Sequence, residues 1–115
     1  MLRNFLRKRE ALLAKAQENH ITYAVPGHPL IAERTVQLLL ERGPESGIEL
    51  DIGGGQSFLD AMFQALKIDP IEGFQLLDGT ELSRDSLLLK NHTIIGQVYD
   101  SFVASEVKLT LMEKL

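Results

Sequence analysis

The run Pro26-Gly27-His28-Pro29 carries a histidine that can act as a base, a metal ligand or a hydrogen-bond donor. His20 and His92 do not lie at helical ligand spacing from His28, and no cysteine or paired acidic cluster accompanies it, so a metal site is not expected. Two roles stay open for His28. It either contacts a bound ligand or caps a helix that begins at Pro29.

A glycine-rich run, Gly53–Ser57, is the second stretch that could hold a ligand. Glycines that lead into a helix N-terminus present free backbone N–H groups and a partial positive charge, which suit a carboxylate or a phosphate. The alternative is a tight turn in which Ser57 caps the helix, with Asp60 completing an acidic variant of the capping box. Neither a Walker pattern nor a Gly-x-Ser-x-Gly elbow is present, so the run predicts no mononucleotide site and no serine nucleophile.

Each of these runs follows a strand-like segment and leads into a helical pattern. Residues 21–25 are rich in β-formers, and Ile48, Leu50 and Ile52 alternate with acidic residues. The pattern predicts a helix at 2–18, a strand at 21–25, a helix from Pro29 to Gly43, a strand at 48–52, a helix from Ser57 to Pro70, a strand at 73–79, a short helix or turn at 83–91, a strand at 92–100 and a tail from Ser105. The tail fits a strand or a helix, and we favour a helix capped by Ser105 because its residues are good helix formers.

This alternation predicts an α/β fold, with a mostly parallel sheet flanked by helices and ligands at the carboxyl ends of the strands. The chain has 115 residues, enough for one modest domain or parts of two. Its net charge of −4 argues against general nucleic-acid binding. The basic cluster of Arg3, Arg7, Lys8 and Arg9 is either a solvated helix face, the commoner case, or an anion or membrane-surface patch. With no cysteine and no apolar run of about 20 residues, we expect a cytoplasmic protein without a membrane partner.

Three longer runs resemble the tetrapyrrole (corrin/porphyrin) methylase family: YAVPGHPLIAERTVQLL, GGGQSFLDAMFQALKIDPIEGFQLLDG and IIGQVYDSFVASEVKLTLMEKL. More narrowly, residues 10–115 resemble the methylase-like domain of Bacillus-type MazG fusion proteins. Members of the family are S-adenosylmethionine-dependent methyltransferases with two α/β domains, usually dimers, that bind the cofactor in the cleft between the domains. The resemblance therefore implies a planar, tetrapyrrole-like small-molecule acceptor and self-association as a homodimer or higher oligomer.

The same resemblance implies which residues contact the cofactor. Gly27-His28-Pro29 stands where the family has Gly-Asp-Pro, and the run Gly54–Phe58 stands where the family has Pro-Gly-Val-Ser-Ser-Phe. The strand that ends at Gln97 and Val98 is similar to the first strand of the second methylase domain. The implied cofactor set is Gly27, His28, Pro29, Ile31, Gly55, Ser57, Phe58, Gln97 and Val98. No catalytic residue is implied.

Two departures from the family modify this expectation. His28 replaces an aspartate, and the family's first strand with its Gly-x-Gly-Pro-Gly-Asp loop has no counterpart. We therefore expect a central fragment, truncated at both ends and inactive alone, in which residues 1–79 are the C-terminal part of the first methylase domain and residues 80–115 a linker and the start of the second. A rival interpretation is a non-catalytic regulatory or interaction module of a MazG-type nucleotide pyrophosphohydrolase fusion. Pyrophosphohydrolysis itself is not expected of this segment, because its glutamates form no paired set on one helix to hold magnesium.

Overall fold

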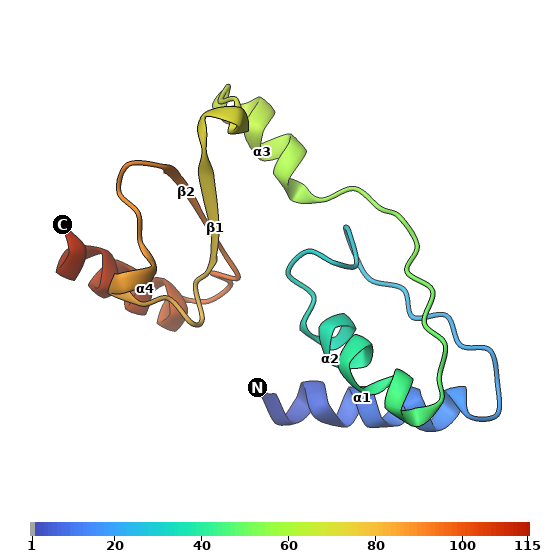
Figure 1. Ribbon diagram of the computed structural model, residues 1–115. Coiled ribbons are helices and arrows are strands. Elements are labelled where there is room, and N and C mark those ends of the chain that lie inside the picture. Colours follow the sequence, from blue (N-terminus) through green and yellow to red (C-terminus); the bar gives the residue numbers. More distant parts are fainter. Residues whose placement is uncertain (1) are drawn as a thin grey trace. The chain divides into compact units, whose positions relative to one another are not determined.

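The computed structural model describes residues 2–115, which form helices and a small parallel sheet (Figure 1). The elements are α1 (Leu2–Ala16), α2 (Arg34–Arg42), η1 (Pro44–Ser46), α3 (Phe58–Leu66), η2 (Pro70–Glu72), β1 (Phe74–Asp78), η3 (Arg84–Ser86), β2 (His92–Gly96) and α4 (Ser101–Lys114), where η denotes a single 3₁₀ turn. The predicted α/β class is confirmed, and so is parallel strand pairing, although the sheet has two strands. The chain divides into two compact units, Met1–Ala61 and Met62–Leu115.

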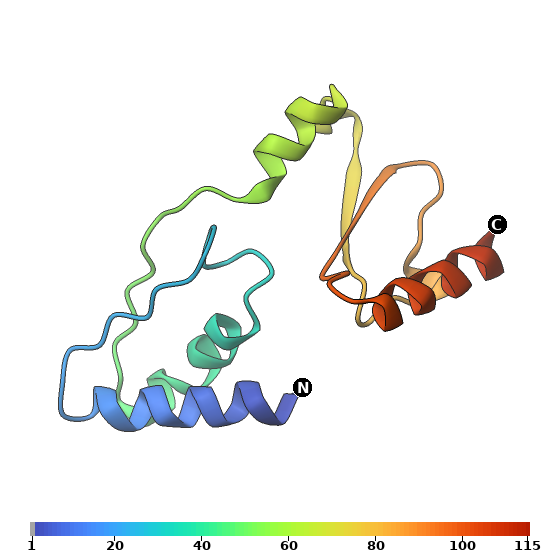
Figure 2. The same ribbon diagram turned by 180° about the vertical axis from the view of Figure 1, so that it is seen from behind.

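The first unit is built on the packing of α1 against α2 (Figure 2). Both helices are amphipathic, because their apolar residues recur at helical spacing. The buried apolar side chains of this unit are Leu13 on α1 and Val36, Leu38 and Leu39 on α2. Thr35 is buried beside them at 1% exposure. The ion pairs of Glu10 with Arg9 and Arg42 lie on the surface, where they contribute little.

Three predictions in the first unit are wrong. The segments predicted as strands at 21–25 and 48–52 have no regular secondary structure and run as extended chain, since neither has a strand beside it. The helix predicted from Pro29 begins at Arg34. The intervening residues form a turn in which the Ile31 N–H donates to the His28 carbonyl at 3.1 Å, and Ala32 has a left-handed φ of 59°, which a right-handed helix cannot contain.

The second unit is organised around β1 and β2, which pair in register from Phe74 opposite His92 to Asp78 opposite Gly96. The strands lie within the predicted ranges 73–79 and 92–100 but are shorter. Gln75 ties the crossover to the sheet: its Oε1 accepts from the Leu88 N–H at 2.8 Å and from the Thr93 hydroxyl at 3.0 Å. A buried cluster of Leu87, Ile94, Val103 and Val107 forms the core.

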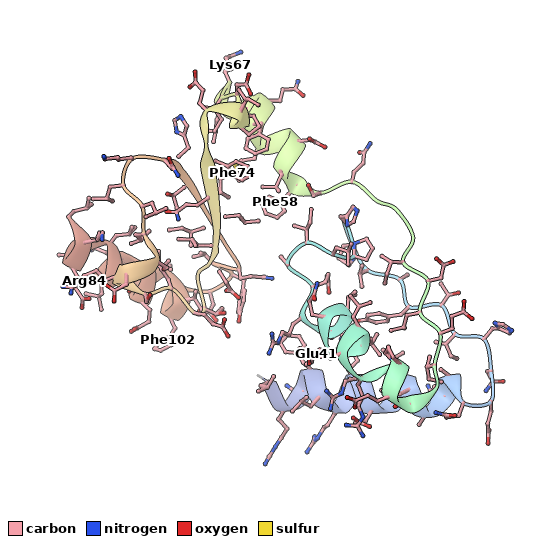
Figure 3. All side chains as sticks on the ribbon, in the orientation of Figure 1. Glu41, Phe58, Lys67, Phe74, Arg84 and Phe102 are labelled. Atoms are coloured by element: carbon pink, nitrogen blue, oxygen red, sulfur yellow. The ribbon has the colours of Figure 1, made fainter. Side chains whose placement is uncertain are left out.

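Helix α3 begins next to the predicted Ser57 cap but ends at Leu66, before the predicted stop at Pro70. Lys67, labelled in Figure 3 at the end of α3, has a left-handed φ of 56°, and the Ile68 N–H reaches back to the Phe63 carbonyl at 3.3 Å. This bond is the helix-terminating contact of a Schellman-type cap. The ring of Phe63 then packs edge-on against Phe74 of β1, with ring centroids 5.1 Å apart.

The predicted C-terminal helix is confirmed as α4, but its cap is not Ser105. The helix begins at Ser101, because the Asp100 carboxylate accepts a hydrogen bond from the Val103 N–H at 2.8 Å. Ser105 lies exposed inside the helix. None of the helices in residues 2–115 has the length and apolar character needed to cross a bilayer.

Replacing Asp100 by alanine removes this N-cap, so we expect Asp100→Ala to lower the free energy of unfolding by about 0.5–2 kcal/mol. Ser105→Ala is the matched control, and its effect should stay within about 0.5 kcal/mol because the side chain is exposed and caps nothing. Urea unfolding followed by far-UV circular dichroism measures both. A larger loss for Ser105→Ala than for Asp100→Ala would contradict the observed cap.

Candidate functional site

The structure brings together the two turns that the sequence singled out, Pro26–Pro29 and Gly53–Ser57. A Cβ atom placed on Gly55 would lie 2.9 Å from the Gly27 carbonyl oxygen and 3.3 Å from the Cα of His28. A Cβ on Gly27 would lie 3.6 Å from the Gln56 carbonyl oxygen. The backbones of the two turns are thus in contact. At position 55 only glycine fits without displacing the neighbouring backbone.

The chain reaches these turns through two extended segments that run in the same direction. We call residues 20–25 the first extended segment and residues 48–54 the second. Just before the two segments start, the Gln17 side-chain amide donates a hydrogen bond of 3.0 Å to the Ser46 carbonyl. Just after the segments end, Gly27 lies against Gly55. The contacting turns therefore lie at the carboxyl end of two parallel segments, which is the position that the α/β prediction gave them.

Both extended segments are anchored to the helices below them. The Lys8 ammonium of α1 lies 5.9 Å from the centroid of the Tyr23 ring, a cation–π contact that fixes the first segment. In the second segment the Leu50 side chain packs against Gly43, where an added Cβ would come within 2.6 Å of it. Of the basic cluster on α1, Lys8 and Arg9 thus have partners inside the unit, since Arg9 also pairs with Glu10 at 2.9 Å.

A cavity of about 860 Å³ lies between the two extended segments. Its floor comes from α1 and α2 and is apolar, with Leu12, Leu13, Ala16, Val36, Leu39 and Leu40. Gly27, Pro29, Gly53 and Gly54 line its end beside the two turns. The sequence did not predict this cavity. The signal that could have revealed it was the pair of strand-like segments at 21–25 and 48–52, each of which leads into a turn.

His28 is half-buried and serves its own turn. Its Nδ1 accepts a hydrogen bond of 3.1 Å from the Leu30 N–H, so in the neutral ring the proton is on Nε2. The expected capping role is thus partly right. The imidazole caps the turn that precedes α2, although no helix begins at Pro29. Nε2–H is the ring group that could meet a ligand.

Ser57 is the capping residue of α3, as one of the two interpretations expected. Its Oγ accepts from the Leu59 N–H at 3.2 Å, while Asp60 makes no return bond to it in the described structure. Phe58, labelled in Figure 3 at the first position of α3, is 42% exposed. Ile31 is half-buried in the turn that follows His28.

The remaining two residues of the predicted cofactor set, Gln97 and Val98, belong to the second unit. They follow β2, where Gln97 adopts a left-handed φ of 60° and Val98 is 40% exposed. Val98 packs on Gly79, whose N–H donates to the Gly96 carbonyl at 2.8 Å. Across residues 2–115 no three histidine, aspartate or glutamate side chains converge on a point where a metal ion could bind.

Comparison with known proteins finds one close relative. The uncharacterized protein YabN of Bacillus subtilis (strain 168) is 58% identical over 106 residues, which make up 92% of this chain and 22% of YabN. The chain therefore spans about a fifth of the length of the curated relative that it matches. No family model and no solved structure matches the chain.

The contact between the turns can be tested at two neighbouring glycines. Gly55→Ala places a methyl group 2.9 Å from the Gly27 carbonyl, whereas a Cβ on Gly54 meets nothing within 4 Å, and neither glycine has a positive φ. We expect Gly55→Ala to lower the free energy of unfolding by about 1–3 kcal/mol, as overpacking does, and to shift the amide NMR signals of residues 26–31. Gly54→Ala should do neither. Equal effects of the two variants would contradict the contact.

Proposed function

We propose that this chain is part of an S-adenosylmethionine-binding methyltransferase domain of the tetrapyrrole methylase type. One observation carries the proposal: the turn containing Gly27-His28-Pro29 and the turn containing Gly55 and Ser57 meet at the carboxyl end of two parallel segments. These are the runs that the resemblance to the methylase family selects for cofactor contact. Glycine turns at this end of an α/β unit are where ligands of such folds bind.

The residues present at the meeting point are of the types that such a cofactor needs. Added Cβ atoms on Gly53 and Gly54 would meet only open space, so the backbone there can be approached closely by a ligand. The Nε2–H of His28 offers a hydrogen-bond donor, and the exposed ring of Phe58 offers an apolar face. We assign Gly27, His28, Pro29, Ile31, Gly55, Ser57 and Phe58 to this wall. Gln97 and Val98, which the resemblance also selects, lie in the second unit and are not assigned to it.

S-adenosylmethionine supplies a methyl group that its sulfonium already activates. The residues of this chain therefore have to hold the cofactor, orient it and exclude water from it. They do not have to move a proton. A planar acceptor of the tetrapyrrole class, homodimer formation and a cytoplasmic location belong to the same proposal. Self-association has one supporting feature, since α4 exposes apolar side chains that include Phe102 at 72% (Figure 3).

A second candidate is a non-catalytic binding or regulatory module of a MazG-type fusion protein, and the state of His28 favours it. The family's aspartate would offer two acceptor oxygens at this position. The imidazole offers only the Nε2–H donor, because Nδ1 already accepts from Leu30. Such a change is compatible with retained binding and lost methyl transfer.

Calorimetric titration of S-adenosylhomocysteine into this chain and into full-length YabN tests the proposal. In whichever protein binds, His28→Ala and Ser57→Ala, or the same changes at the aligned YabN positions, should each raise the Kd at least about tenfold, which corresponds to about 1.4 kcal/mol. His92→Ala and Ser105→Ala are matched controls in the second unit, where both residues are exposed, and should leave the Kd unchanged.

Absence of binding to both proteins would refute the cofactor proposal. A Kd that neither His28→Ala nor Ser57→Ala changes would show that the cofactor binds elsewhere. A methyl-transfer assay on YabN with porphyrinogen acceptors separates the two candidates: binding together with transfer supports the methyltransferase, and binding without transfer supports the regulatory module.

A further inference from the structure

One of the two hydrogen bonds that close the turn at His28 depends on the charge of its imidazole. Nδ1 of His28 accepts from the Leu30 N–H at 3.1 Å, and the His28 carbonyl accepts from the Ile31 N–H at 3.1 Å. The first of these bonds exists only while Nδ1 carries no proton. An imidazolium ion has two N–H donors and no acceptor, and rotating the ring by half a turn replaces Nδ1 by a C–H group. No orientation of the protonated ring can therefore accept from Leu30.

The same turn forms one side of the contact with the glycine-rich run. A Cβ on Gly55 would lie 2.9 Å from the Gly27 carbonyl oxygen and 3.3 Å from the Cα of His28, so the backbone of residues 27 and 28 is itself the contact surface. Gly27 has a left-handed φ of 79°, and a glycine can change its backbone conformation at low steric cost. Loss of the Leu30 bond therefore leaves the turn free to move away from Gly55.

The surroundings of His28 leave the turn bond as the interaction that a proton alters. The run that packs on it, residues 53–57, contains no titratable side chain. In the described part of the chain the ion pairs join Arg9, Arg42, Glu10 and Glu45, so none of them includes His28. The nearest charged residues along the two runs are Glu33, Arg34, Asp51 and Asp60. The half-buried ring is reached by water, which can deliver the proton.

We propose that His28 is a proton-sensitive switch for the contact between the two glycine turns. In the neutral ring Nδ1 holds the Leu30 N–H, and Gly27 and His28 lie against Gly55. A proton taken from water onto Nδ1 breaks the bond to Leu30 and releases the turn from Gly55. Histidine is the side chain whose charge ordinarily changes between about pH 5 and pH 8. The contact is therefore present at the upper end of that range and lost at the lower end.

The switch concerns the bonds of the turn itself and does not rest on the proposed function. It is measured on the chain without any ligand, so a failure of cofactor binding leaves it standing, and the reverse is also true. Where both hold, a ligand that contacts the two turns together binds more weakly at the lower pH, because part of its binding energy has to restore the contact.

NMR spectroscopy of this chain at about pH 7.5 and about pH 5.5 tests the switch. The imidazole ¹⁵N shifts of His28 should show the Nε2–H tautomer at the higher pH and the imidazolium ion at the lower. The nuclear Overhauser effect between the Hα atoms of His28 and Gly55 should weaken at the lower pH. The protection of the Leu30 amide against solvent exchange should fall by about twofold to tenfold, as removal of one hydrogen bond of ordinary strength predicts.

Substitutions at His28 separate the turn bond from other effects of pH. In His28→Asn the side-chain oxygen can accept from the N–H two residues on and takes up no proton, so both readouts should keep their high-pH values throughout. His28→Ala has no acceptor and should show the low-pH values at both pH values. His20→Asn, at an exposed histidine of the same unit, is the matched control and should leave the pH response unchanged. Retained exchange protection in α1 and α2 shows that a sample is folded.

Three outcomes would overturn the inference. The first is an unchanged nuclear Overhauser effect and unchanged Leu30 protection while His28 takes up its proton, which would show that protonation does not open the turn. The second is the same pH response in His28→Asn, which would assign the response to another group. The third is an imidazole that stays uncharged at the lower pH or carries its proton on Nδ1 at the higher pH.

Discussion

A peptide group that leaves water needs another hydrogen-bond partner, and the rest of this structure depends on where such partners are found. In the second unit β1 and β2 find them in each other, and the crossover between the strands is fastened by the side chain of Gln75. In the first unit two segments of similarly strand-like composition find almost none: of their described backbone groups, the Ile48 N–H alone is paired, with the Gly43 carbonyl at 2.9 Å. They remain extended, held by their side chains rather than by their backbones.

Short polar side chains supply the partners at the ends of helices and turns. Asp100 caps α4, Ser57 caps α3, and the carboxylate of Asp69 accepts from the Ile71 N–H at 2.9 Å at the start of η2. The imidazole of His28 does the same for its turn. Two residues of the candidate site, His28 and Ser57, therefore stabilise local structure through these bonds. Any ligand contact they make has to be compatible with that role.

The candidate site follows from the same constraint. Parallel segments that begin together and end together bring their following turns into contact, and the contact at Gly27 and Gly55 is close enough to require glycine. Between those ends, side chains of α1 and α2 line the cavity together with both segments. The contact between the turns and the cavity between the segments are therefore two consequences of one arrangement.

The sequence by itself determined the mixed α/β class, the approximate positions of α1, α3, α4, β1 and β2, and the parallel direction of strand pairing. The helices follow from side-chain periodicity and from neighbours close in the chain, as at the Ser57 cap. The sequence predicted the cap of α4 at Ser105, whereas the structure has it at Asp100. Only the tertiary structure decided that residues 21–25 and 48–52 are not strands, that α2 begins at Arg34 after the turn at Ala32, and that Gly55 touches Gly27. A strand forms only beside a partner strand, which can lie anywhere in a polypeptide. A strand-like composition therefore favours a strand without specifying its partner.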